Sequence, residues 1–292
     1  MLVIKIINKL SIVLVLFVLA VSHIVFAEKV QLKISEKITS NAEFYSGDTD
    51  KPAIMILHGF LLNHNFHTVS RLAESLNESG YTVLTPTLSL GVNKRKQGLP
   101  CEAIHLHSLE TDIKEIEKWA KWLEGKVANE IVILGHSSGS IHLINYLNAS
   151  ASNKNKVKQI ILLAIPHFGV LTSYSFETPE NAQAAREQVA KGSKAIAEYG
   201  LSYCKKYITT ATNYLSYYNL NKQYIEEELD NLQVNKTIIY GTDDKFIDLQ
   251  WIKSLANKNV KIIPIEGANH FFDYEYEFSL LNVVEDILST KS

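Results

Sequence analysis

The chain has 292 residues, of which 46% are apolar and 21% are charged. This length suits one large domain, or one domain with an insertion, and it allows a core that needs no metal or disulfide to fold. The net charge of −2 argues against nucleic-acid binding, because proteins that bind phosphate backbones usually carry a strong basic excess.

The first 27 residues have the pattern of a secretory signal peptide. Lys5 and Lys9 precede an apolar stretch over 10–21, and Val25-Phe26-Ala27 supplies suitable residues for the −3 and −1 positions of a cleavage site. We therefore expect an exported protein, either periplasmic or secreted. The alternative is an N-terminal membrane anchor that is not cleaved, since the uncharged segment is long enough to span a bilayer.

Short apolar runs alternate with longer amphipathic stretches after the signal segment, which is typical of a mostly parallel sheet flanked by helices, an α/β fold. An antiparallel hairpin is expected first, over 30–35 and 42–45. The strands that follow are expected at 53–57, 81–85 (ending before Pro86), 130–134, 159–164, 237–240 and 260–265. Helices are expected at 69–78, 109–123, 138–148 and 274–288.

A long segment between the strands at 159–164 and 237–240 interrupts this alternation. Its roughly 70 residues are far more than a crossover between parallel strands needs. Residues 179–229 look largely helical and are rich in tyrosine. We expect a helical cap at about 168–233, inserted in a single domain over 28–292 and lying over the carboxyl edge of the sheet. A peripheral helical pair without substrate contact is the alternative.

The two cysteines, Cys101 and Cys204, leave two possibilities open. In an exported protein they can form one disulfide that closes a long loop, and otherwise they are two buried thiols. No CxxC or Cys/His cluster has the spacing of a structural zinc site. His105 and His107 lie close to Cys101, but no fourth ligand is evident, and we interpret them as polar loop residues. No metal is expected.

The strongest chemical signal is Gly135-His136-Ser137-Ser138-Gly139, which directly follows an apolar strand and precedes an amphipathic helix. In that context a G-x-S-x-G turn presents its serine on a strained backbone. The glycines allow neighbouring chain to pass where a Cβ would not fit. The helix N-terminus also directs amide groups towards developing negative charge. Ser137 is therefore the candidate nucleophile.

A nucleophilic serine needs a base, and the base needs an acid that orients it. Residues 241–244 read Gly-Thr-Asp-Asp, and residues 267–270 read Gly-Ala-Asn-His. Both stretches follow predicted strands, at the edge where open α/β sheets build their sites. His270 is thus the candidate base, and Asp244 or Asp243 is the candidate acid.

From about Lys29 to its C-terminus the chain resembles the α/β-hydrolase-fold enzymes. The serine motif, the G-x-x-D and G-x-x-H loops, and the His58-Gly59 pair all match motifs of that family, in the chain order Ser, Asp, His. The G-x-x-D spacing favours Asp244. The resemblance further implies an oxyanion hole formed by the backbone amides of Phe60 and Ser138, and acyl transfer that requires no cofactor.

The resemblance implies a serine hydrolase that cleaves carboxylic esters or related acyl bonds. Serine peptidase, thioesterase and acyltransferase activities are alternatives on the same triad, because the fold does not decide among them. A non-catalytic exported binding protein is the alternative of another class. The expected partner is a small, partly apolar acyl substrate, and membrane or lipid contact is left open. Residues 85–91 lack the Asp-x-x-Gly-x-Gly-x-Ser run of many relatives, so no subfamily is assigned.

Overall fold

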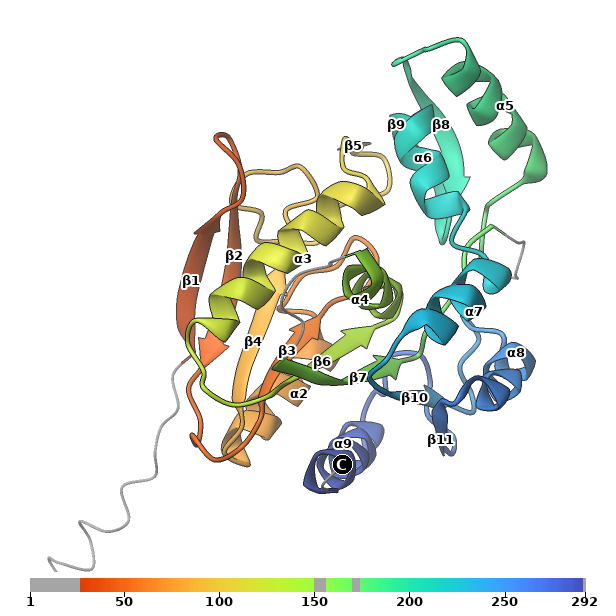
Figure 1. The fold of residues 1–292 in the computed structure, drawn as a ribbon. Coiled ribbons are helices and arrows are strands. Elements are labelled where there is room, and N and C mark those ends of the chain that lie inside the picture. Colours follow the sequence, from red (N-terminus) through yellow and green to blue (C-terminus); the bar gives the residue numbers. More distant parts are fainter. Residues whose placement is uncertain (1–26, 150–155, 170–173, 291–292) are drawn as a thin grey trace, which may run out of the picture.

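The structure, a computed structural model, describes residues 27–149, 156–169 and 174–290. The predicted signal peptide at 1–27 lies outside the described residues except for Ala27. Within them, the main sheet has the strand order β1-β2-β4-β3-β6-β7-β10-β11 (Figure 1). Its strands are β1 (Glu28–Lys33), β2 (Thr39–Tyr45), β3 (Ala53–Leu57), β4 (Thr82–Thr87), β6 (Ile131–His136), β7 (Val157–Leu163), β10 (Asn235–Gly241) and β11 (Lys261–Ile265).

The pairing of these strands confirms the predicted mostly parallel sheet. The β1–β2 hairpin is antiparallel and joins the sheet through an antiparallel β2–β4 pair. All pairs from β4 to β11 are parallel. The carboxyl ends of β3, β6, β10 and β11 therefore meet at one edge, where parallel sheets of this kind carry their sites.

Helices cover both faces of the sheet, as predicted. Helices α2 (His67–Glu78) and α9 (Tyr276–Ser289) pack together on one face, and α3 (Leu109–Glu124) and α4 (Ser138–Ala149) pack on the other. Alternation along β3 explains this arrangement, because successive side chains of a strand point to opposite faces. Ile56 belongs to the cluster under α2 and α9, whereas Leu57 belongs to the cluster under α3 and α4.

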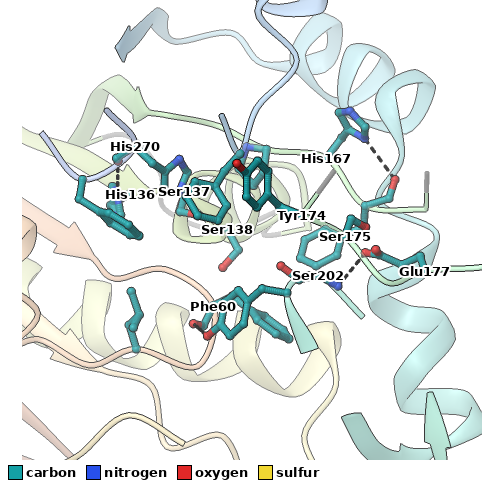
Figure 2. A pocket seen from close by; sticks show the side chains of 16 residues that line it. Phe60, His136, Ser137, Ser138, His167, Tyr174, Ser175, Glu177, Ser202 and His270 are labelled. Atoms are coloured by element: carbon teal, nitrogen blue, oxygen red, sulfur yellow. Dashed lines mark hydrogen bonds between the residues drawn. The ribbon is translucent and has the colours of Figure 1, made fainter. Parts of the chain in front are cut away.

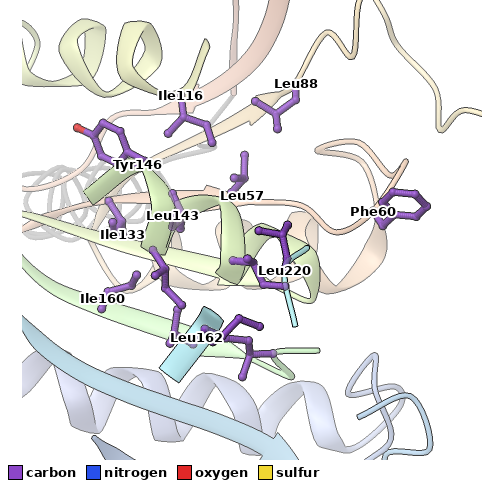
Figure 3. Packing of buried hydrophobic residues seen from close by; sticks show 14 of the residues in the cluster. Leu57, Phe60, Leu88, Ile116, Ile133, Leu143, Tyr146, Ile160, Leu162 and Leu220 are labelled. Carbon is purple, nitrogen blue, oxygen red and sulfur yellow. The ribbon is translucent and has the colours of Figure 1, made fainter. Parts of the chain in front are cut away.

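The larger of these two clusters extends from the sheet into the inserted segment. Leu57, Ile133 and Leu143 pack at its centre, and Phe60 and Leu220 lie further along it (Figure 3). Full burial of each aliphatic side chain contributes about 1.5–3 kcal/mol. The position of the inserted segment is therefore determined partly by the same core that supports the sheet.

The prediction that the second parallel strand ends before Pro86 is wrong, because β4 continues to Thr87. Pro86 pairs with Ala42 of β2, whereas β3 contacts β4 only as far as Leu84. Beyond Leu84 one side of β4 has no neighbouring strand. Proline, which lacks an N–H, is tolerated where its nitrogen can face such an unpaired side.

The inserted segment is mixed rather than helical, so the prediction of a helical cap is wrong over 196–210. It contains α5 (Pro179–Ala190), β8 (Ile196–Leu201), β9 (Cys204–Thr210), α6 (Ala211–Tyr218) and α7 (Lys222–Asn231). Strands β8 and β9 form an antiparallel hairpin whose turn includes Ser202, at φ 52°. Its Tyr, Ile and Thr residues favour strands, and buried Tyr199 and Tyr207 face each other across the pair. We call residues 174–220 the cap.

The cap projects from one end of the sheet and is tied to the loop that follows β4 (Figure 1). Strand β5 (Ile104–His105) of that loop pairs in parallel with β9. A disulfide joins Cys101 to Cys204, across a sequence separation of 103. Of the two states left open by the sequence, the structure has the bridged one. The chain ends with α8 (Leu249–Ser254), a 3-10 turn (Leu255–Lys258), β11 and α9.

The described residues include no helix that is long and apolar enough to cross a membrane.

We expect the Cys101→Ser/Cys204→Ser double variant to lose about 2–4 kcal/mol of free energy of unfolding, because the bridge restricts a long loop in the unfolded chain. Urea unfolding of both proteins, followed by tryptophan fluorescence, measures the difference. Dithiothreitol should destabilise the wild type and leave the double variant unchanged. Equal urea midpoints for the wild type and the double variant, each with and without dithiothreitol, would contradict a structural role for the bridge.

Candidate active site

Ser137 lies on a sharp turn between β6 and α4, with the left-handed φ of 54°. Its amide donates to the carbonyl of Leu163 in β7, at 2.8 Å. The positions on either side of the turn must be glycine, because a Cβ there would clash with neighbouring backbone atoms. A Cβ on Gly135 would lie 2.5 Å from the Ser140 nitrogen, and one on Gly139 would lie 2.6 Å from the His58 carbonyl oxygen. The predicted motif thus has the strand–turn–helix geometry that exposes a serine hydroxyl.

The structure brings the three candidate residues Ser137, His270 and Asp244 together in one hydrogen-bonded chain. His270 Nε2 lies 3.0 Å from Ser137 Oγ, and Nδ1 lies 2.7 Å from Asp244 Oδ2. The Asp244 side chain is fully buried, and its other oxygen accepts the amide of Phe246 at 2.8 Å. Asp243, the alternative acid, is exposed and uses its backbone amide to bond Ala268.

The loops that carry the acid and the histidine are packed closely against each other. A Cβ on Gly241 would lie only 2.1 Å from the carbonyl oxygen of Ala268. Asn269 Oδ1 accepts the amides of Phe271 and Asp273, at 3.0 and 3.3 Å, and so closes the turn that presents His270. These contacts limit the freedom of the His270 ring relative to Ser137.

His136 provides a further support that the sequence did not reveal. Its Nε2 lies 3.0 Å from the carbonyl oxygen of His270. Burial, together with the nearby His270, lowers the pKa of His136 to about 3, so the ring is neutral at physiological pH. A neutral imidazole carries one N–H, and at Nε2 this N–H donates to His270. The side chain preceding the nucleophile thus positions the backbone of the proposed base.

The two residues whose amides are expected to form an oxyanion hole, Phe60 and Ser138, lie beside Ser137. Ser138 is the first residue of α4, so its amide has no partner within the helix. A Cβ on Gly59 would lie 3.1 Å from Ser137 Cβ, which shows that the segment leading to Phe60 passes beside the nucleophile. His58 Nδ1 lies 2.9 Å from the Gly59 carbonyl oxygen, which belongs to the same peptide group as the Phe60 amide.

A buried arginine holds His58 in the tautomer that this contact requires. His58 Nε2 accepts the Leu88 amide at 3.1 Å and lies 3.3 Å from Arg95 Nη2. Burial and the charge of Arg95 keep the pKa of His58 well below its usual range, so Nδ1 carries the single proton. Arg95 itself donates to three carbonyls, those of Leu88, Gln97 and Leu62. No local motif identifies Arg95, because its environment is created by a loop that folds back onto the sheet.

A second buried polar cluster joins the cap to the helices behind Ser137. Asp112 of α3 lies 2.9 Å from His107 Nδ1 and 3.4 Å from His142 Nε2, and it accepts the hydroxyl of Tyr217 from α6. His142 Nδ1 contacts the carbonyl oxygen of Ser138 at 2.7 Å. The cluster therefore connects the cap to the first turn of the nucleophile helix.

His105 and His107 belong to the packing around this cluster. His107 Nε2 lies 3.1 Å from the hydroxyl of Tyr207, and the His105 ring stacks on Tyr207 with centroids 4.2 Å apart. Both histidines are buried, because the cap covers the loop that carries them. The described part of the chain contains no group of three or more His, Cys, Asp or Glu side chains that could hold a metal ion.

A cavity of about 70 Å³ opens beside Ser137 Oγ. The sheet domain contributes Ser137, His270 and Phe60, and the cap contributes Glu177 (Figure 2). Tyr203 of the cap also lines the cavity. The Tyr203 hydroxyl also donates to the carbonyl of Phe60, at 3.0 Å. Residues of the cap therefore line the same cavity as the serine, which the alternative of a peripheral helical pair does not predict. Phe and Tyr are the most frequent large side chains in its walls, so the cavity suits an apolar group.

We expect the free energy of unfolding to fall in acid as Asp112 is protonated. Burial by itself raises the pKa of Asp112, but His107 and His142 outweigh it and hold this pKa well below the usual 3.8. Since the folded pKa is depressed, the contribution of Asp112 is complete above about pH 5 and is lost as the pH falls below about 4. Asp112→Asn should be less stable by about 2–4 kcal/mol at pH 7, and the difference should shrink in acid.

Urea unfolding at several pH values between 3 and 7 measures this difference. Glu110→Gln is the matched control, because Glu110 is an exposed carboxylate on the same helix and should change stability little. Parallel stability–pH curves for the wild type and Asp112→Asn would show that the buried carboxylate contributes nothing.

Comparison with known proteins supports the fold. Residues 52–203 match the family model described as alpha/beta hydrolase fold. The structure of Est1E from Butyrivibrio proteoclasticus superposes with a TM-score of 0.63 at 16% identity, covering 89% of this chain and 97% of that chain. The alpha/beta hydrolase GrgF from Penicillium sp. sh18 has a TM-score of 0.67 at 13% identity, covering 90% of this chain and 98% of that chain.

A thioesterase domain from the curacin biosynthetic pathway is also similar. Its TM-score is 0.61 at 17% identity, and the match covers 89% of this chain and 99% of that chain. No curated protein matches the sequence. At these identities the likeness to solved structures concerns the fold alone.

Proposed function

This chain belongs to the alpha/beta hydrolase fold family, and on that premise we propose that it is a serine hydrolase that cleaves carboxylic esters of small molecules. The observation that supports this proposal most directly is the hydrogen-bonded chain from Ser137 through His270 to buried Asp244, at 3.0 and 2.7 Å. A hydroxyl, an imidazole and a carboxylate in this order are the parts that acyl transfer through a serine requires.

In the first step of the proposed mechanism, Ser137 Oγ attacks the ester carbonyl while His270 Nε2 takes its proton. Asp244 accepts the Nδ1 proton of His270 in a hydrogen bond and stabilises the imidazolium that forms. The amides of Phe60 and Ser138 stabilise the tetrahedral oxyanion, an interaction that contributes about 3–4 kcal/mol per donor. His270 then returns the proton to the leaving alcohol, and an acyl-enzyme remains.

In the second step, water attacks the acyl-enzyme. His270 removes a proton from the water, and the same two amides stabilise the second oxyanion. Collapse of this intermediate releases the carboxylic acid and returns the proton to Ser137. The aromatic walls of the cavity favour a partly apolar acyl group, and the residues involved need no metal or organic cofactor.

We also propose that the protein is exported to the periplasm or the medium. The signal-like pattern at 1–27 suggests this location. The Cys101–Cys204 bridge is consistent with it, because disulfides persist in oxidising compartments and are rare in reducing ones.

A fluorophosphonate probe should label the wild type on Ser137, because an activated serine attacks phosphorus as it attacks a carbonyl. Labelling should disappear in Ser137→Ala, and kcat for a simple ester should fall by a factor of about 10⁴ to 10⁶. Gel fluorescence and initial rates measure the two effects. Failure of folded wild-type protein to react with the probe would favour a non-catalytic binding protein.

Substitution of the two neighbouring aspartates separates their roles. Asp244→Asn should lower kcat by about 10⁴, because the amide cannot hold His270 in the required tautomer or stabilise its charge. Asp243→Asn, the matched control, should keep a kcat close to that of the wild type, since Asp243 is exposed and does not contact His270. Similar rates for the two variants in ester hydrolysis would refute the assignment of Asp244.

A further inference from the structure

A buried carboxyl group in the cavity is not used by the proposed mechanism. Glu177 precedes α5 and is only 1% exposed, yet its side chain lines the cavity that contains Ser137 (Figure 2). Its position is well defined, because Thr178 caps α5 and Oε1 accepts the amide of Ser202 at 2.9 Å. The contact with Ser202 joins the start of α5 to the β8–β9 turn.

The second oxygen of this carboxyl group, Oε2, has no hydrogen-bond partner among the described residues. Ser175 Oγ, on the same wall of the cavity, is also buried and unpartnered there. Buried polar atoms are nearly always hydrogen-bonded, because their desolvation is costly when it is not compensated. Ser175 and Glu177 are close in the chain and both line the cavity, so a polar group of a ligand bound there can supply the missing partner.

The charge state of Glu177 indicates which polar group fits. Burial raises the pKa of Glu177 to about 7, although the amides of Ser202, Glu177 itself and Gly169 act in the opposite direction. Within the described residues no lysine, arginine or histidine forms an ion pair with it. A cation buried here would need a full counter-charge, which a carboxyl group that is partly protonated at neutral pH does not supply. A neutral hydroxyl can donate to Oε2 and accept from Ser175 Oγ.

The remaining walls of the cavity restrict the rest of the ligand. Phe60, Phe168, Tyr203 and Phe246 present rings to the cavity. The acyl group stays attached to Ser137 after the alcohol leaves, so it is the part of an ester that must occupy enclosed space beside Oγ. An apolar acyl group with a distal hydroxyl combines these requirements.

We propose that Glu177 and Ser175 form a specificity subsite for a hydroxyl group on an apolar acyl chain, so that the preferred substrates are esters of hydroxylated acids. This inference rests on the proposed serine hydrolase function and deepens it. Glu177 determines specificity by contact with the substrate and takes no part in bond cleavage. Its removal should therefore change the choice of substrate rather than the chemistry at Ser137.

The test compares matched esters that differ in one hydroxyl group. The substrates are the methyl esters of phenylacetic and 3-phenylpropanoic acids and their meta- and para-hydroxyl derivatives. For at least one pair, the wild type should show a kcat/KM at least about tenfold higher for the hydroxylated ester, because a site built around a hydroxyl rejects the analogue that lacks it.

Glu177→Leu should bring the ratio of kcat/KM values within each pair close to one, and this ratio is the readout whatever the rate for the unsubstituted ester. Glu177→Gln, which retains a carbonyl acceptor, should keep part of the preference. The matched control is Glu180→Leu, at an exposed position in the first turn of α5, which should behave as the wild type. A near-ultraviolet circular dichroism spectrum and a urea midpoint close to those of the wild type show that Glu177→Leu is folded. Equal rates within every pair, or a preference that survives in Glu177→Leu, would overturn the proposal.

A binding measurement separates this proposal from the hydrolase assignment. The primary amides of the same acids are titrated calorimetrically into Ser137→Ala and into Ser137→Ala/Glu177→Leu. At least one hydroxylated amide should bind to Ser137→Ala about tenfold tighter than the amide that lacks the hydroxyl. The same two amides should bind to Ser137→Ala/Glu177→Leu with equal affinity. If the two affinities do not differ in Ser137→Ala, the subsite proposal is overturned, even if the wild type hydrolyses esters. Conversely, the difference without labelling or hydrolysis in the wild type supports the subsite and rejects the proposed function.

Discussion

The left-handed backbone at Ser137 is the constraint on which the rest of the site depends. A side chain in that conformation is strained, and only the surrounding structure can maintain it. Here the amide of Ser137 is bonded to β7, Gly139 brings α4 close to the end of β3, and Gly135 brings β6 close to the first turn of α4. The parallel sheet therefore positions the serine and also the loops that carry Asp244 and His270, because all of them leave the same edge of the sheet.

The cap and the sheet domain are joined by three different kinds of interaction. A disulfide links Cys204 to the loop after β4, a shared apolar core continues under both parts, and Asp112 bonds side chains of both. Tyr203 adds a direct contact to the carbonyl of Phe60, next to the expected oxyanion hole. Packing in the cap is thus coupled to the geometry of the turn that carries Ser137. The cap itself supplies none of the three hydrogen-bonded residues Ser137, His270 and Asp244.

Sequence patterns predicted the features that depend on residues close together in the chain. The G-x-S-x-G turn needs its glycines locally, and the strands and helices of the sheet domain follow from apolar periodicity. The β8–β9 hairpin was missed because its tyrosines also fit a helical spacing, and the extension of β4 through Pro86 depends on which neighbours β4 has. Arg95 and Asp112 belong to no motif, because their partners come from distant loops.

The sequence by itself determined the α/β class, the order of serine, acid and histidine, and the preference for Asp244 over Asp243. The α/β class follows from apolar periodicity along the chain, and the resemblance of three short motifs to those of the α/β-hydrolase-fold enzymes indicated the order and favoured Asp244. Only the tertiary structure decided that Cys101 meets Cys204 and that Glu177 lies buried in the cavity of Ser137. Disulfide formation and burial depend on distances between segments far apart in the chain, and no local pattern encodes those distances.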